Sequence, residues 1–129
     1  MQYMLYTNTV NHLIKRHPQV SRRIVEVPMA FLCISSITEG ELLFGLAKRP
    51  DARRLHTAVK EFLLRVDVLP WNCAARYGAV RADIERRGKT LGSIDLLIGT
   101  HALNIGAVLV TNDRAFSQLA DLHVEDWTA

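Results

Sequence analysis

Hydrophobic positions along the chain alternate between two spacings. Short apolar or β-forming runs predict strands, and longer segments with an apolar residue every three or four positions predict helices. The predicted strands cover residues 2–7, 30–35, 66–69 and 107–110, with a last short one around Val124. The predicted helices begin near Asn8, Pro18, Ser36, Pro50, Asn72 and Ser93. This alternation indicates a three-layer α/β fold, with a mainly parallel sheet of about five strands flanked by helices.

Polar side chains mark the expected starts of several helices. Asn8, Asn72 and Ser93 each stand before a helical pattern and are good N-cap residues, because their side chains accept a hydrogen bond from the first free backbone N–H groups. Gly88 follows the basic residue Arg87, which is a typical helix C-terminus. We therefore expect these positions to bound the helices.

The length and composition predict one globular domain over residues 1–129. The chain has a mass of 14.6 kDa, with 49% hydrophobic and 22% charged residues. No apolar run approaches the roughly 20 residues that span a bilayer, and no export signal is visible, so we expect a cytoplasmic protein without a membrane segment. Cys33 and Cys73 are too few for a disulfide framework and are expected to be buried apolar residues.

The chain is moderately basic, and arginine dominates its cationic residues. Sixteen Lys and Arg residues face 13 Asp and Glu residues, which leaves a net charge of +3. Six arginines form three adjacent pairs, at residues 22–23, 53–54 and 86–87. The planar guanidinium suits phosphate oxygens, so a nucleic-acid partner stays open. By charge alone, solvated helix faces are the better interpretation of these pairs.

Acidic residues follow three separated parts of the predicted sheet. Asp113 comes just after the strand at residues 107–110, Asp95 lies in the first turn of a helix, and Glu41 lies in the helix after the second strand. Ligand sites in parallel sheets gather beyond the carboxyl ends of the strands, so the three carboxylates are expected to converge. Their mutual repulsion would favour a hard divalent cation, and oxygen ligation of Mg²⁺ or Mn²⁺ suits phosphodiester hydrolysis.

The chain resembles the PIN-domain ribonucleases, specifically the VapC-type toxins of bacterial toxin–antitoxin pairs. The matching motifs are Met-Leu-Tyr-Thr-Asn-Thr from Met4, Ile-Ser-Ser-Ile-Thr-x-x-Glu-Leu from Ile34, Gly-x-x-Asp from Gly92 and Thr-Asn-Asp-Arg-Ala-Phe from Thr111. Each motif alone is weak. Together they cover almost the whole chain in the order and spacing of the family.

This resemblance implies an Mg²⁺- or Mn²⁺-dependent endoribonuclease whose catalytic and metal-binding acids are Glu41, Asp95 and Asp113. It also implies a VapB-type antitoxin that covers the site, a toxin homodimer, and contact with DNA only through the antitoxin. Some close relatives cut initiator tRNA in the anticodon region, which makes that RNA the expected substrate. Asn8 and Thr111 are supporting candidates that could hold an acid or a metal-bound water, with helix and turn capping as the equally supported alternative.

The first motif departs from the family pattern at Tyr6. The family has an aspartate at this catalytic position, in the pattern Leu-Asp-Thr-Asn. A phenol has an ordinary pKa near 10, so it is neutral at pH 7 and gives little of a carboxylate's metal affinity. Its ring would also fill part of the space that a metal needs. We therefore expect this chain to be an inactive or weakly active form of the toxin.

Two other functions compete with the nuclease interpretation. A non-catalytic toxin scaffold would bind its antitoxin and contribute to transcriptional repression through it, and Tyr6 makes this alternative serious. A Rossmann-type nucleotide-binding regulator is the weakest possibility, because no glycine-rich loop follows the first predicted strand.

Overall fold

Five parallel strands form the centre of the computed structural model, which describes residues 1–129. The strands are β1 (Tyr3–Leu5), β2 (Leu32–Ser35), β3 (Asp67–Leu69), β4 (Val108–Val110) and β5 (Val124–Glu125). Their order in the sheet is β3-β2-β1-β4-β5, so β1 lies in the middle. Tyr3 is in register with Leu32 on one side and with Val108 on the other. All four pairings are parallel, which confirms the predicted α/β class.

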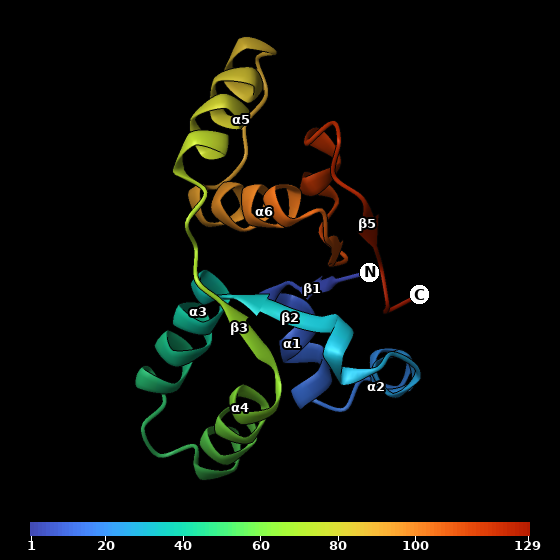
Figure 1. Cartoon of the computed structure of the whole chain (residues 1–129). Coiled ribbons are helices and arrows are strands. Elements are labelled where there is room, and N and C mark those ends of the chain that lie inside the picture. The colour runs from blue at the N-terminus through green and yellow to red at the C-terminus, as the bar shows by residue number, and fades with distance from the viewer.

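Helices cover both faces of this sheet (Figure 1). The α-helices are α1 (Thr7–Ile14), α2 (Pro18–Glu26), α3 (Ser36–Ala47), α4 (Arg53–Arg65), α5 (Ala74–Arg86) and α6 (Ser93–Ile105). Two short 3₁₀ helices are η1 (Met29–Phe31) and η2 (Arg114–Gln118). In Figure 1, α1 to α4 lie on one side of the sheet and α5 and α6 on the other, with α5 farthest from the strands.

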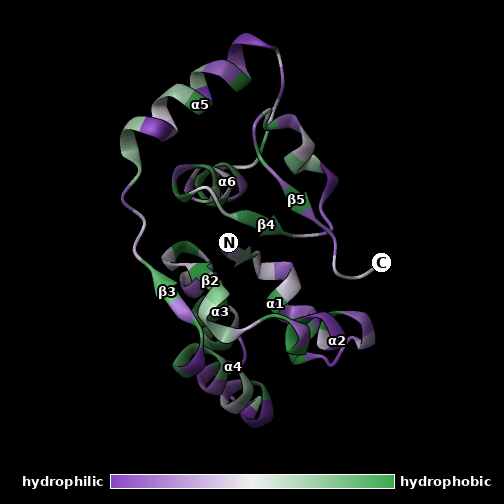
Figure 2. Cartoon of the chain, turned by 45° about the vertical axis from the view of Figure 1, so that its right-hand side comes forward, coloured by the Kyte–Doolittle hydropathy of each residue, from purple (hydrophilic) through white to green (hydrophobic).

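Successive strand residues point into two different hydrophobic cores, as the alternation of side chains along a strand requires. In β1, Met4 belongs to the core under α5 and α6, and the next residue, Leu5, belongs to the core under α1 to α4. In β4, Leu109 and Val110 divide in the same way. Figure 2 shows a hydrophobic β4 in the interior and a mostly hydrophilic α2 at the surface. The chain is therefore a three-layer structure with the sheet in the middle.

The structure corrects the predicted helix caps. None of Asn8, Asn72 and Ser93 is an N-cap: these positions are held by Tyr6, Cys73 and Gly92, and none of these three makes a side-chain cap hydrogen bond. The Asn8 side chain donates to Asn112 instead, because the N-cap of α1 is two residues earlier, at Tyr6, and Asn8 lies within the helix. A side-chain cap that was not predicted is Ser35, whose Oγ accepts from the N–H of Ile37 at the start of α3.

The expectation for the two cysteines agrees with the structure. Cys33 and Cys73 are free and buried, and burial raises the pKa of the Cys33 thiol to about 12, so this thiol stays protonated and unreactive. No helix of the chain combines the length and the apolar character that crossing a lipid bilayer demands.

Candidate active site

The candidate site lies at the carboxyl ends of the central strands. Tyr6 follows β1 directly and is the N-cap of α1, and Asp113 follows β4 by three residues and is the N-cap of η2. Asp95 lies in the first turn of α6, and Glu41 lies at the middle of α3. All four side chains are partly buried. Because β1 and β4 are adjacent and parallel, the residues that follow them emerge at the same edge of the sheet.

Tyr6 makes a direct contact with Asp95. Its hydroxyl donates a hydrogen bond to Asp95 Oδ1, and its ring packs edge-to-face on Phe116 with the ring centroids 5.0 Å apart. Burial raises the pKa of the phenol well above its ordinary value, and the hydrogen bond and negative charge of Asp95 raise it further. The charges of Asp113 and Glu41 add smaller increases in the same direction. The phenol is therefore neutral at pH 7, and it lies within electrostatic reach of all three predicted acids.

These residues do not form a metal-binding group in their present arrangement. No set of three Asp, Glu, His or Cys side chains anywhere in the chain is close enough together to hold one ion. One oxygen of Asp95 already accepts a hydrogen bond from the Tyr6 hydroxyl. A neutral phenol can donate this bond, whereas an ionised carboxylate at pH 7 cannot. The three acids are thus within electrostatic reach of Tyr6 without forming one group around a common ion, so the present arrangement does not fit the expected Mg²⁺ or Mn²⁺.

Asn8 and Thr111 belong to one hydrogen-bond chain that ends at Asp113. Thr111 Oγ1 donates to Asn8 Oδ1 over 3.3 Å and accepts from the backbone N–H of Asp113 over 3.1 Å. Asp113 in turn accepts from the N–H of Ala115 over 2.9 Å and so caps η2. The three side chains shape the turn after β4. Thr111 therefore caps the turn after β4, whereas Asn8 is not a helix cap and contributes its hydrogen bonds to Asn112 and Thr111.

Two bridges join α3, which carries Glu41, to α6, which carries Asp95. The buried His101 ring lies 2.8 Å from Ser35 Oγ through its Nδ1 atom, and burial lowers the pKa of His101 so that the ring is neutral at pH 7.

The second bridge passes through Trp71. Its backbone N–H donates to Ser36 Oγ over 3.0 Å, and its indole N–H donates to the carbonyl of Leu97 over 2.9 Å. The sequence patterns predicted neither the His101 bridge nor the Trp71 bridge. No periodic pattern reports such a bridge, because its partners lie 26 and 35 residues away along the chain.

Comparison with known proteins decides the family. Residues 3–122 match the PIN domain. The chain is 34% identical to the tRNA(fMet)-specific endonuclease VapC of Shigella flexneri, over 99% of each chain. It is also 34% identical to the ribonuclease VapC2 of Haemophilus influenzae, over 98% of each chain. The chain belongs to the VapC family of PIN-domain proteins. The resemblance that its motifs suggested is therefore confirmed at the level of the family.

Solved VapC structures share this PIN-domain architecture over nearly the whole chain. A chain in the crystal structure of VapBC2 from Rickettsia felis, bound to a DNA fragment from its promoter, superposes with a TM-score of 0.89 at 32% identity. A chain in DNA-bound VapBC from Salmonella typhimurium superposes with a TM-score of 0.90 at 35% identity. Each match covers 98% of this chain and at least 98% of the other. The PIN-like α/β fold is thus shown.

Proposed function

We propose that this chain is the toxin component of a toxin–antitoxin pair, with an endoribonuclease centre that Tyr6 impairs. The observation that carries the proposal is the contact between the Tyr6 hydroxyl and Asp95. The three acids that the family pattern assigns to catalysis are present, and all three act electrostatically on Tyr6. A neutral phenol stands where that pattern has an aspartate, so the site lacks one negative charge and one oxygen ligand.

A Tyr6→Asp variant tests this proposal. It removes the ring and adds the missing carboxylate, so RNA cleavage in the presence of Mg²⁺ or Mn²⁺ is expected to rise roughly a hundredfold or more, the scale on which active-site charge stabilisation acts. EDTA should abolish the gain. Cleavage is measured on end-labelled RNA under single-turnover conditions.

Tyr6→Phe is the matched control. It frees Asp95 from its hydrogen bond but supplies no charge, so it should cleave no faster than the parent. Asp95→Asn in the Tyr6→Asp background should return activity to the parent level. Equal cleavage by the parent and the Tyr6→Asp variant would show that Tyr6 does not impair the site.

The proposed substrate of the restored centre is initiator tRNA, cut in the anticodon region. This choice is supported by two relatives named tRNA(fMet)-specific endonucleases, which are 34% and 35% identical over nearly the whole chain. The test compares initiator and elongator methionine tRNA as substrates of the Tyr6→Asp variant. Equal cleavage of the two tRNAs would contradict this specificity.

The second candidate function is binding without catalysis. Solved relatives are toxin–antitoxin complexes, two of them on DNA, which supports a VapB-type antitoxin as the partner here and DNA contact through it. A homodimer of this chain is part of the same proposal. If the Tyr6→Asp variant stays inactive on every RNA while the parent binds its antitoxin and the complex represses transcription, the non-catalytic scaffold is the correct function.

A further inference from the structure

The turn between α3 and α4 carries positive charge that the protein itself does not neutralise. Between residues 48 and 54 there is one acid, Asp51, and there are four cations, Lys48, Arg49, Arg53 and Arg54. All five side chains are exposed, and none takes part in a salt bridge. By contrast, Arg81 and Arg86 of α5 and Arg87 at its C-cap are each paired with Glu85 or Asp83 of that helix.

The positions of two of these arginines do not favour helix stability. Arg53 and Arg54 are the first two residues of α4, whose first turn contains no acid. The N-terminal end of a helix has a partial positive charge, so cations there are unfavourable and raise the local potential further. An anionic partner therefore accounts for two cations at this helix end better than helix stability does.

A groove connects this turn to the candidate active site. It has a volume of about 270 Å³ and lies between α1, α3 and α4. Glu41, whose charge acts on Tyr6, and Lys48 both line it. Lys48 is the helical C-cap of α3, seven residues after Glu41, so the two lie on one face of the helix, about 10 Å apart along its axis. A chain that leaves Glu41 along this groove therefore reaches Lys48, the first of the cations in the turn.

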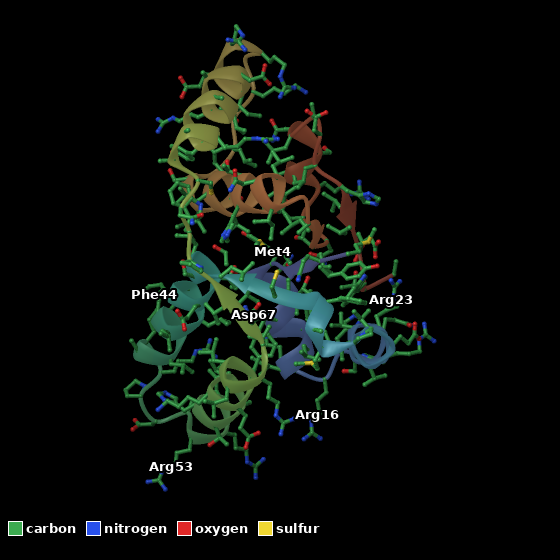
Figure 3. The ribbon with its side chains drawn as sticks, in the orientation of Figure 1. Met4, Arg16, Arg23, Phe44, Arg53 and Asp67 are labelled. Carbon is green, nitrogen blue, oxygen red and sulfur yellow. The ribbon has the colours of Figure 1, made fainter.

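An exposed aromatic side chain lies beside the groove. Phe44 lines it and is 57% exposed, and Lys48 Nζ is 4.7 Å from the centre of its ring. Figure 3 labels Phe44 on α3 and Arg53 at the start of α4, both on the α3–α4 side of the molecule. Exposed aromatic rings interleaved with cations are the usual surface for single-stranded nucleic acid, because bases stack on the ring and phosphates meet the cations.

We propose that the α3–α4 basic surface, defined as Phe44, Lys48, Arg49, Arg53 and Arg54, binds the single-stranded RNA segment next to the cleavage site. The cations contact phosphates, and one base stacks on Phe44. An acidic peptide could satisfy the cations equally well, but it would have no flat base to place on the ring. This inference rests on RNA as the proposed substrate, and it states where the RNA next to the cleavage site contacts the protein.

RNA binding by the parent chain tests the surface directly. The parent keeps Tyr6, and EDTA in the buffer prevents cleavage, so the dissociation constant of a short fluorescent single-stranded RNA can be measured by anisotropy at several KCl concentrations. Lys48→Ala together with Arg49→Ala should weaken binding about tenfold and reduce the slope of log K against log[KCl] by about 1.4, since each lost phosphate contact on a single strand accounts for about 0.7.

The matched control is Arg86→Ala together with Arg87→Ala, which removes the same charge from α5 and should leave the slope unchanged. Phe44→Leu should weaken binding about tenfold, and Phe44→Trp should preserve it, because only an aromatic ring offers a stacking face. Circular dichroism of each variant confirms folding, as expected for exposed positions.

The outcomes separate this inference from the proposed function. If the Lys48/Arg49 variant keeps the RNA affinity and the salt slope of the parent, the proposed RNA-binding surface is wrong, even if the Tyr6→Asp variant gains cleavage. Loss of RNA binding supports the surface, even if Tyr6→Asp stays inactive. If Phe44→Leu alters the sedimentation coefficient or antitoxin binding but not RNA affinity, the surface is a protein interface and the inference is wrong.

Discussion

At the scale of the residue, Tyr6 supplies a hydrogen-bond donor to the Asp95 carboxylate. A carboxylate at position 6 would be ionised at pH 7 and would only accept hydrogen bonds, so it would repel Asp95 unless a cation or proton lay between them. The phenol donates a hydrogen bond to Asp95 and stays neutral. The Asp95 carboxylate is therefore hydrogen-bonded by a neutral group of the chain itself.

His101 makes a pH-dependent contribution to stability. Burial lowers the pKa of His101 in the folded state below its ordinary value of 6.5, so the unfolded chain binds the proton more readily. The free energy of unfolding should therefore fall as pH decreases below about 6.5 and continue to fall until the folded-state pKa is passed. Urea unfolding at pH 7.5 and 5.5 measures this loss.

His101→Asn should show a smaller loss between the two pH values than the parent, because asparagine does not titrate and can still offer a polar atom to Ser35. His123→Asn, at an exposed position, is the control and should keep the pH dependence of the parent. The role of His101 is contradicted if its variant loses as much stability on acidification as the parent does.

At the scale of the element, α6 contacts two parts of the candidate site, Tyr6 and η2. Its first turn presents Asp95 to Tyr6, and its middle packs against η2, the segment that Asp113 caps. Gly99 permits this close packing, since a Cβ atom there would meet Leu119 and lie 3.4 Å from the Phe116 ring. The positions of Asp95 and Asp113 therefore depend on a small residue in the helix interior.

Gly99→Ala should lower the free energy of unfolding by about 1–3 kcal/mol, the usual cost of overpacking a buried contact, although alanine is the better helix former. Gly78→Ala in α5 is the matched control. A Cβ atom at Gly78 meets nothing within 4 Å, so this variant should gain roughly 0.5–1 kcal/mol. Chemical denaturation of both variants measures the difference, and a stabilised Gly99→Ala would refute the packing argument.

At the scale of the whole molecule, the C-terminal segment is attached to the first core. Trp127 is 1% exposed, and its indole N–H donates to Glu125 Oε1 over 2.9 Å. Arg23 of α2 forms a 3.2 Å salt bridge with Glu125 and lies 5.1 Å from the Trp127 ring. Tyr3 of β1 packs on the same ring. This cluster connects the chain's last strand, its first strand and α2.

Trp127→Ala should therefore destabilise the whole domain, by roughly 3–5 kcal/mol, the range for large-to-alanine changes in a core. Its effect is expected in the midpoint of a single cooperative unfolding transition followed by circular dichroism. Thr128→Ala, at the next residue, should change stability by less than about 0.5 kcal/mol if Trp127 and not the segment as a whole is responsible. Comparable losses in the two variants would falsify this assignment.

The local sequence pattern was sufficient for the order and type of the elements. Runs such as residues 107–110 and the spacing of apolar residues after Pro18 predicted strands and helices that the structure contains, because periodicity directly reflects which side faces the core. The exact helix starts were less predictable. Asn8 and Ser93 are favourable N-cap residues by type. The paths of β1 and of the loop before α6 instead make Tyr6 and Gly92 the N-caps of α1 and α6.

The sequence by itself determined the fold class and the family, since these depend on residue types and on their order along the chain. The assignment of Glu41, Asp95 and Asp113 as site acids stays a prediction from the same motifs. Only the tertiary structure decided which groups form hydrogen bonds with these residues. Tyr6 and Asp95 are 89 residues apart, and Ser35 and His101 are 66 apart. Contacts over such separations arise from strand order and helix packing, so these hydrogen bonds cannot be read from spacing alone.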